Sequence, residues 1–260
     1  MKHQLSVLCP GIRPQNWVKL YNSIGESFSG RWEIVFISPY GLPPQLKEKQ
    51  NVTHISDFGT PIRCQQRGLI ESNGEWITWA ADDGFYLNNA LNIGFIKLAA
   101  ENMNKKVLVM GKYIEGHDHN GVMKDNPYYV LSNHDASFSK YLPKNYLMLN
   151  VGIVSRETLL EVGGWDCQFE VCPMAYNDLA VRLQNHGVRF LIQDEIMFKC
   201  GHMPGHEGDH GPIHDAQVDH DQPLYQQIWT AGREVERRIF IDLDNWKNTP
   251  ERWERRFGKI

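Results

Sequence analysis

The stretch GEWITWAADDGFY, from Gly74 to Tyr86, decides the fold because it joins a short apolar run directly to two adjacent acids. The run at residues 76–81 has the length of a buried strand, and Gly84 suits a turn after it. Ligands of α/β proteins bind beyond the carboxyl ends of such strands. The strand therefore predicts that the carboxylates of Asp82 and Asp83 lie at the mouth of a ligand site.

A divalent cation is the expected ligand of this acidic pair. Adjacent carboxylates repel each other, and Mg²⁺ or Mn²⁺ removes that cost because both cations prefer oxygen ligands and bridge to phosphate. We therefore expect a metal–diphosphate site at Asp82 and Asp83. The alternative is an acidic turn that binds nothing.

Composition sets wide bounds on the class of protein. The chain has 260 residues, of which 42% are hydrophobic and 22% charged, as in an ordinary globular protein of one large or two small domains. The net charge of −4 gives no global basic field for nucleic acid. Five cysteines without a dense framework indicate reduced thiols. No stretch resembles a signal peptide or a membrane span, so we expect a cytoplasmic protein without a transmembrane segment.

Periodicity predicts alternating strands and helices. Besides the central strand, strands are expected at residues 5–9, 33–37, 52–56, 107–113, 147–155 and 189–192, and helices at 17–28, 61–72, 87–102, 156–162, 178–186 and 225–239. Thr60 and Pro61 are a typical helix start, and Gly163-Gly164 a typical helix stop. The pattern favours one α/β domain with a mostly parallel sheet flanked by helices and a helical C-terminal tail.

Three motifs, in this order, resemble those of family 2-like glycosyltransferases with the GT-A fold. The central strand with Asp82-Asp83 is similar to the family's DxD-type motif. The segment VGIVSRETLLEVGGWD, Val151–Asp166, resembles its acceptor-side signature. Asp178-Leu179 with Arg182 resembles the helix that carries the catalytic carboxylate. The resemblance covers residues 4–200 and implies a GT-A domain at 1–225, with a nucleotide-sugar half at 1–105, an acceptor half at 106–225, and a helical extension at 226–260.

The resemblance also implies roles for single residues. Asp83 and Asp82 would hold Mn²⁺ or Mg²⁺ and the donor, and Asp178 would be the general base. Further donor contacts would come from Pro10, Arg13, Arg63 and Arg67, and the sugar and acceptor pocket from Gly163, Gly164, Trp165 and Asp166. The chain departs from the family at the catalytic helix, where the usual Glu-Asp pair is missing because Asn177-Asp178 follow Ala175-Tyr176. Glu170 is therefore a second candidate for the base.

A histidine-rich stretch at residues 201–222 carries the other chemical signal. Its glycines and prolines argue against a continuous helix, and we expect a long loop. In some GT-A enzymes a histidine from this region completes the metal site, which makes His202 and His210 candidate ligands here. The alternatives are a solvated or acceptor-contacting loop and a separate zinc site.

The expected function is that of a metal-dependent, inverting glycosyltransferase of the hexosyltransferase type. It would move a sugar from a nucleotide-sugar donor, with a UDP-sugar favoured, to a hydroxyl of a glycan, a lipid-linked sugar, a protein or modified nucleic acid. The alternatives are a nucleotidyltransferase on a related sheet, a zinc hydrolase, and an inactive nucleotide- or glycan-binding module. The basic tail after Asp242 could also make a peripheral contact with an anionic partner.

Overall fold

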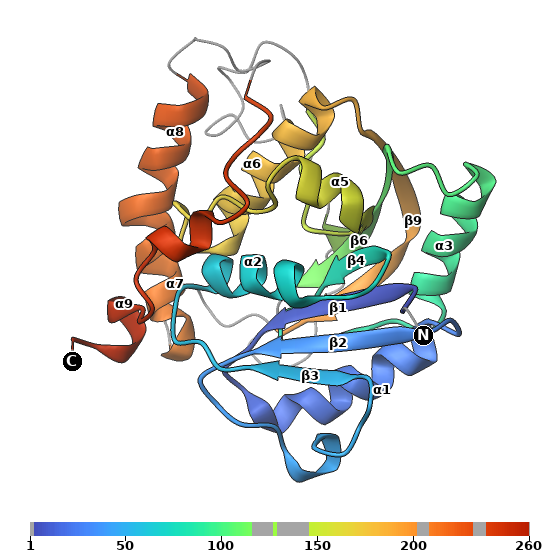
Figure 1. The fold of residues 1–260 in the computed structure, drawn as a ribbon, viewed down its shortest axis with the longest axis horizontal. Helices are drawn as coiled ribbons and strands as arrows, with labels where there is room; N and C mark the ends of the chain where they lie inside the picture. The colour runs from blue at the N-terminus through green and yellow to red at the C-terminus, as the bar shows by residue number, and fades with distance from the viewer. Residues whose placement is uncertain (1–2, 116–126, 129–145, 202–207, 231–237, 260) are drawn as a thin grey trace.

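The computed structural model describes residues 3–115, 127–128, 146–201, 208–230 and 238–259. These residues form an α/β domain around a mixed, mostly parallel sheet, with a helical C-terminal region (Figure 1). This confirms the predicted fold class.

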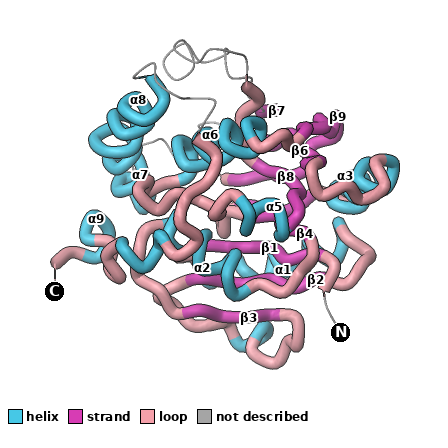
Figure 2. The backbone as a smooth tube through the Cα atoms, turned by 45° about the horizontal axis from the view of Figure 1, so that its top comes forward, coloured by secondary structure: helices cyan, strands magenta, loops and turns pink. Residues whose placement is uncertain are grey.

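The strands follow the order β3-β2-β1-β4-β8-β6-β9-β5, and Figure 2 shows most of them as one band across the molecule. The parallel strands of the first half are β1 (Leu5–Pro10), β2 (Trp32–Ile37), β3 (Val52–Ile55) and β4 (Trp76–Trp79). The second half adds β5 (Gly84–Tyr86), β6 (Val107–Glu115), β7 (Pro127–Tyr128), β8 (Val151–Ser155) and β9 (Arg189–Cys200). β8 is antiparallel to both of its neighbours, β4 and β6, while β6 and β9 are parallel.

Helices cover both faces of the sheet, and the apolar residues divide between the same two faces. The helices are α1 (Trp17–Ser27), α2 (Pro61–Glu71), α3 (Ala90–Ala100), α5 (Arg156–Glu161), α6 (Cys172–Asn185), α7 (Gly211–Ala216), α8 (Gln222–Thr230) and α9 (Glu254–Phe257). One core cluster contains residues of α1 and α3, and the other contains residues of α2, α5, α6 and α8. Trp76 and Trp79, three residues apart on β4, point to opposite faces and are both buried.

The local signals for α2 and α5 are confirmed. Thr60 caps α2, since its hydroxyl accepts a hydrogen bond from the backbone N–H of Arg63 at 3.2 Å, and Pro61 opens the helix. Gly163 and Gly164 follow α5 with φ values of 85° and 72°, a region that favours glycine.

Several boundaries differ from the expectation. Strand β8 begins at Val151 rather than at residue 147, and β9 continues to Cys200 rather than ending at residue 192. Helix α6 begins at Cys172 rather than near residue 178, because Pro173 opens it and the residues from Met174 to Tyr176 are already buried. The expected loop at 201–222 was wrong for its second half, since residues 208–222 are helical. Gly211 and Pro212 stand in the first turn of α7, where a missing N–H costs nothing.

The C-terminal segment after residue 238 packs back onto the domain. The N–H of Ile241 donates to the carbonyl of Val162 at 3.2 Å, and the N–H of Trp253 donates to the carbonyl of Phe58 at 2.7 Å. Figure 1 shows α9 on the side to which the arrowheads of β1, β2 and β3 point. None of the helices in the described part of the chain is long and apolar enough to cross a membrane.

Gly163 provides a test of the packing of this segment. A Cβ at Gly163 would lie 2.1 Å from the carbonyl oxygen of Ile241, whereas a Cβ at Gly187, with a similar φ of 82°, meets nothing within 4 Å. Both Gly163→Ala and Gly187→Ala place an alanine in the left-handed backbone region, which lowers the free energy of unfolding by about 1–2 kcal/mol. We expect Gly163→Ala to lose about 1–3 kcal/mol more in urea unfolding, from the clash. Equal losses would contradict the described packing.

Candidate active site

A cavity of about 700 Å³ opens at the carboxyl ends of the first four strands. Its floor is made by the turn after β1 and by the end of β4, and its walls by the start of α6, by α7 and by the C-terminal segment. The residues on which the argument below depends are Pro10, Arg13, Asp57, Asp82, Asp83, Cys172, Tyr176, Asn177, His210, His214, Gln217, Trp253 and Arg256. A cavity at this edge of the sheet, lined by Asp82 and Asp83, is what the central strand predicted.

Asp82 is buried and fully engaged with the chain itself. Its carboxylate accepts hydrogen bonds from the backbone N–H groups of Ile12 and Arg13, at 2.6 and 2.5 Å, and from the Arg13 guanidinium at 2.5 Å. The indole N–H of Trp17 adds a fourth contact at 3.4 Å. Asp82 therefore fixes the turn between β1 and α1 and has little capacity left for a metal.

Arg13 connects this turn to the histidine-rich stretch. Its guanidinium donates to both carboxylate oxygens of Asp209, at 2.8 and 3.0 Å, in addition to its contact with Asp82. The hydrogen bond from Arg13 holds the pKa of the Asp209 carboxyl below its ordinary value. The arginine thus joins two acids from distant parts of the chain at the rim of the cavity.

Asp83 and His210 are the pair that fits a divalent cation. The carboxylate oxygen of Asp83 lies 3.8 Å from Nε2 of His210, and both side chains are about 15% exposed, at 16% and 15%. The backbone carbonyl of Asp83 accepts from the N–H of Gly201, so the end of β9 fixes its position. One carboxylate and one imidazole suit Mn²⁺ better than Mg²⁺, which prefers oxygen ligands alone. The donor set of the site therefore fits a metal with open positions for phosphate oxygens.

The described residues do not complete a metal site by themselves. Within them, no group of three or more His, Cys, Asp and Glu side chains is gathered for a metal ion. His202, the other histidine predicted as a ligand, lies outside the described residues.

Arg63 and Arg67 were predicted to contact the donor, and the structure places both outside the cavity lining. They bind Asp57, at 3.1 and 2.6 Å, and stack on the indole of Trp246. Asp57 itself lines the cavity and was missed. The available signal was its place just after the third strand, where the strand-end rule used for Asp82 also applies.

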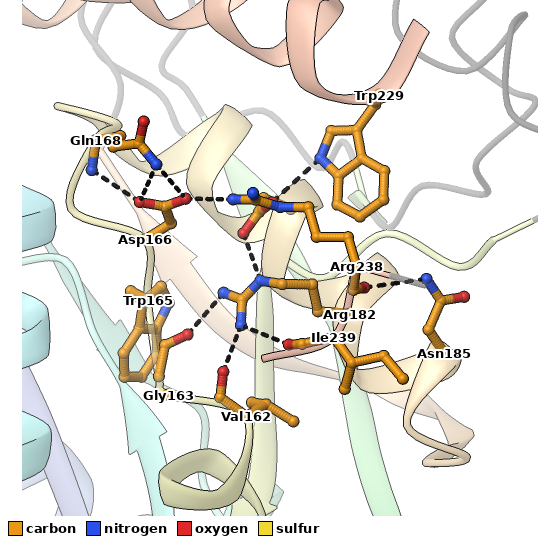
Figure 3. Close-up of polar contacts among 12 residues, drawn as sticks. Val162, Gly163, Trp165, Asp166, Gln168, Arg182, Asn185, Trp229, Arg238 and Ile239 are labelled. Carbon is orange, nitrogen blue, oxygen red and sulfur yellow. Dashed lines mark hydrogen bonds and ion pairs between the residues drawn. The ribbon is translucent and has the colours of Figure 1, made fainter. Parts of the chain in front are cut away.

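Asp178, the predicted base, is buried and does not line the cavity. Its partners Arg182, Trp229 and Arg238 are labelled in Figure 3. Its carboxylate accepts from Arg182 at 2.7 Å, from the indole N–H of Trp229 at 3.1 Å and from Arg238 at 3.3 Å. Arg182 also donates to backbone carbonyls of the loop after α5, including that of Gly164 at 2.7 Å. These contacts give Asp178 a structural task and leave it away from the site.

Glu170, the second candidate for the base, is also engaged elsewhere. Its carboxylate accepts from the indole N–H of Trp253 at 2.6 Å and from Arg255 at 2.9 Å, and it does not line the cavity. The two contacts attach the C-terminal segment to the start of α6.

The glycine-rich loop predicted to form the acceptor pocket does not line the cavity but packs against a residue that does. Gly163, Gly164, Trp165 and Asp166 are absent from the cavity lining. Asp166 binds Arg238 and Gln168, as Figure 3 shows. Trp165 is buried and packs edge-on against Trp79, with 5.5 Å between the ring centroids, and Trp79 does line the cavity.

The wall formed by α6 and α7 carries polar groups other than those that the sequence motifs indicated. His214, Gln217, Tyr176, Asn177 and Cys172 line it. Burial raises the pKa of the Tyr176 hydroxyl and raises that of the Cys172 thiol to about 11, so both stay protonated near neutral pH. His214 is thus the side chain on this wall of the type that most often serves as a general base.

Solved glycosyltransferases resemble this structure over most of its length. TarS 1–349 of S. aureus in complex with UDP has a TM-score of 0.54 at 13% identity, over 89% of this chain and 70% of that chain. The same fragment in complex with UDP-GlcNAc has a TM-score of 0.50 at 14% identity, over 90% and 72%. GalNAc-T7 with UDP, GalNAc and Mn²⁺ has a TM-score of 0.51 at 13% identity, over 78% of this chain and 44% of that chain.

The comparisons establish the fold. TarS and GalNAc-T7 are both GT-A-type glycosyltransferases, and the chain has the GT-A fold. This confirms the fold that the three sequence motifs implied. No protein-family model and no curated protein matches the sequence.

The structural task of Asp178 leads to a testable prediction. Asp178→Asn leaves the fully buried Arg182 without its countercharge, and breaking a buried pair in this way costs about 3–5 kcal/mol. We expect that loss in the free energy of unfolding, measured with urea. Asp194→Asn is the matched control, because the Asp194 side chain is 88% exposed. Unchanged stability of Asp178→Asn with loss of turnover would return Asp178 to the role of base.

Proposed function

We propose that the protein is a glycosyltransferase that binds a nucleotide-sugar donor, a UDP-sugar by preference, in the cavity at the ends of β1–β4. The observation that carries the proposal is the pair Asp83–His210 beside the Asp82–Arg13 turn, on a GT-A fold. Structural neighbours solved with UDP and UDP-GlcNAc support the choice of donor.

The residues of the cavity divide the work of binding the donor. The nucleoside would lie against Pro10 and the turn that Asp82 fixes, near Asp57 at the end of β3. Asp83 and His210 would hold Mn²⁺, which supplies positive charge beside the departing diphosphate. The GalNAc-T7 neighbour was solved with Mn²⁺, which supports this choice of metal.

Transfer of the sugar needs a group that takes the proton of the acceptor hydroxyl. We propose an inverting displacement, with the hydroxyl approaching from the wall of α6 and α7. His214 is our choice for the base, since it lines that wall whereas Asp178 and Glu170 do not. The cytoplasmic location belongs to the same proposal, and five free cysteines, three of them buried, support it.

Donor turnover tests the proposed function. Purified protein is incubated with UDP-, GDP-, dTDP- and CMP-sugars, with Mn²⁺ or with EDTA, and released nucleotide is measured. We expect Mn²⁺-dependent release from one donor, because many transferases slowly pass the sugar to water. No release and no nucleotide binding across the panel would contradict the proposal.

The variant His210→Ala tests whether His210 binds the Mn²⁺ on which the release of nucleotide depends. We expect His210→Ala to raise the Mn²⁺ concentration needed for half-maximal release at least tenfold, since one of the two ligands proposed among the described residues is lost. His186→Ala is the control, because His186 binds Lys106 and Glu161 on the surface. The same Mn²⁺ dependence in both variants would exclude His210 as a ligand.

A nucleotide-sugar-binding protein without transfer activity is the second candidate. It is favoured by one observation: Asp178 and Glu170 are both bonded away from the cavity. His214→Gln separates the two candidates. In a transferase we expect it to lower kcat at least 100-fold while the affinity for UDP stays within twofold. Unchanged turnover would exclude His214 as the base, and absence of turnover in the unaltered protein with UDP bound would favour the binding protein.

A further inference from the structure

We propose that Arg256, from the C-terminal segment at residues 252–257, binds the diphosphate of the donor, so that this segment is the last wall of the donor site. The inference rests on the proposed function and adds a residue that no motif indicated. It concerns a segment that the sequence suggested as a surface for an anionic partner.

The segment is attached to the domain on both sides of the cavity. On the side of β3, the N–H of Trp253 donates to the carbonyl of Phe58 at 2.7 Å, and the rings of Phe58 and Phe257 meet edge-on. On the side of α6, the indole of Trp253 and the guanidinium of Arg255 both bind Glu170. These contacts place the side chains of Trp253, Arg256 and Phe257 on the cavity wall.

Arg256 holds its position with few bonds. Its guanidinium donates one hydrogen bond, at 2.5 Å, to the backbone carbonyl of Asp209 and lies over the ring of Trp253, 5.5 Å from its centroid. The carboxylate of Asp209 is already bound in two places by Arg13. Among the described residues, Arg256 therefore has no carboxylate in ion-pair contact.

The acids Asp57 and Asp82 of the cavity are already paired with other arginines, whereas Arg256 has no such partner among the described residues. Asp57 is paired with Arg63 and Arg67, and Asp82 with Arg13. Arg256 is a partly buried cation that faces the same space as Asp83 and His210. Burial lowers the pKa of its guanidinium, which is the sign of a charge that is not fully compensated. A diphosphate that enters the cavity would supply the compensating anion.

An arginine at this place has the chemistry that a diphosphate needs. The planar guanidinium presents five N–H donors and can bind two phosphate oxygens at once. It would act from the C-terminal wall, while Asp83 and His210 would hold the metal from the side of β4 and the 3₁₀ turn Gly208–His210. The diphosphate would then be bound between two positive centres supplied by distant parts of the chain.

The alternative is that Arg256 only secures the 3₁₀ turn through the Asp209 carbonyl. This structural task would affect the whole site equally, whereas a diphosphate contact acts only on ligands that carry phosphate. Comparison of a nucleoside diphosphate with the corresponding nucleoside therefore separates the two roles.

The experiment measures binding of UDP by calorimetry and of uridine by ligand-observed NMR, both with Mn²⁺. The variants are Arg256→Gln, Arg256→Lys and, as the matched control, Lys259→Gln, which removes one positive charge from an 84% exposed side chain just after this segment. We expect Arg256→Gln to lower the affinity for UDP about 10- to 100-fold, which is the range for a lost charge-assisted hydrogen bond. Uridine binding and the melting temperature should stay unchanged. The affinity of Arg256→Lys for UDP should lie between those of Arg256→Gln and the unaltered protein. The affinity of Lys259→Gln should equal that of the unaltered protein.

Three results would overturn the inference. Equal UDP affinity of Arg256→Gln and the unaltered protein would exclude the contact, while UDP binding by the unaltered protein would leave the proposed function standing. Equal losses for UDP and uridine with a lower melting temperature would assign Arg256 the structural task. If the unaltered protein bound neither UDP nor any diphosphate of the donor panel, the inference and the proposed function would both fail.

Discussion

The carboxylate of Asp82 joins the ends of two neighbouring parallel strands, and the site is built around that junction. Asp82 follows β4, and its carboxylate accepts hydrogen bonds from Ile12, Arg13 and Trp17, which follow β1. A buried carboxylate is costly unless its oxygens accept hydrogen bonds, so Asp82 favours the turn conformation in which Ile12 and Arg13 donate to it. Arg13, fixed by that turn, binds Asp209 and so positions the segment that carries His210. The proposed metal-binding pair, Asp83 and His210, thus depends on an acid whose own oxygens are already bonded within the chain.

A second buried carboxylate organises the other half of the domain. Asp178 gathers Arg182, Trp229 and Arg238, and Arg182 in turn binds the loop that ends α5. The two acids that sequence motifs mark most strongly, Asp82 and Asp178, therefore build the scaffold. The chemistry that we propose falls to less conspicuous groups: Asp83, the histidines of the 3₁₀ turn and of α7, and an arginine of the C-terminal segment. A buried carboxylate needs hydrogen-bond partners for all of its oxygens, whereas a carboxylate that binds a ligand needs an oxygen without such a partner. One side chain therefore cannot easily do both.

The sequence was sufficient for the fold and for one edge of the site. Alternating apolar runs predicted the sheet and its helices, Thr60 and Gly163-Gly164 predicted two helix ends, and the strand before Asp82-Asp83 predicted where the cavity opens. Local patterns could not show that Arg182, one helical turn after Asp178, bonds back to it, nor that Trp229 and Arg238 arrive from much later in the chain. They also could not show that Arg63 and Arg67 would face Asp57, or that Arg256 would reach the cavity. Each of these depends on contacts between residues far apart in sequence, which periodicity and spacing do not encode.

A crystal structure of the protein grown with UDP and Mn²⁺ tests the central claim most directly, namely that the cavity at the ends of β1–β4 is the donor site. The account predicts the nucleoside against the turn that Asp82 holds, Mn²⁺ on Asp83 and His210, and the diphosphate within hydrogen-bond distance of Arg256. Asp82 should keep its bonds to Ile12 and Arg13 and take no place on the metal. Nucleotide bound elsewhere, or in this cavity with the metal on other residues, would contradict the account.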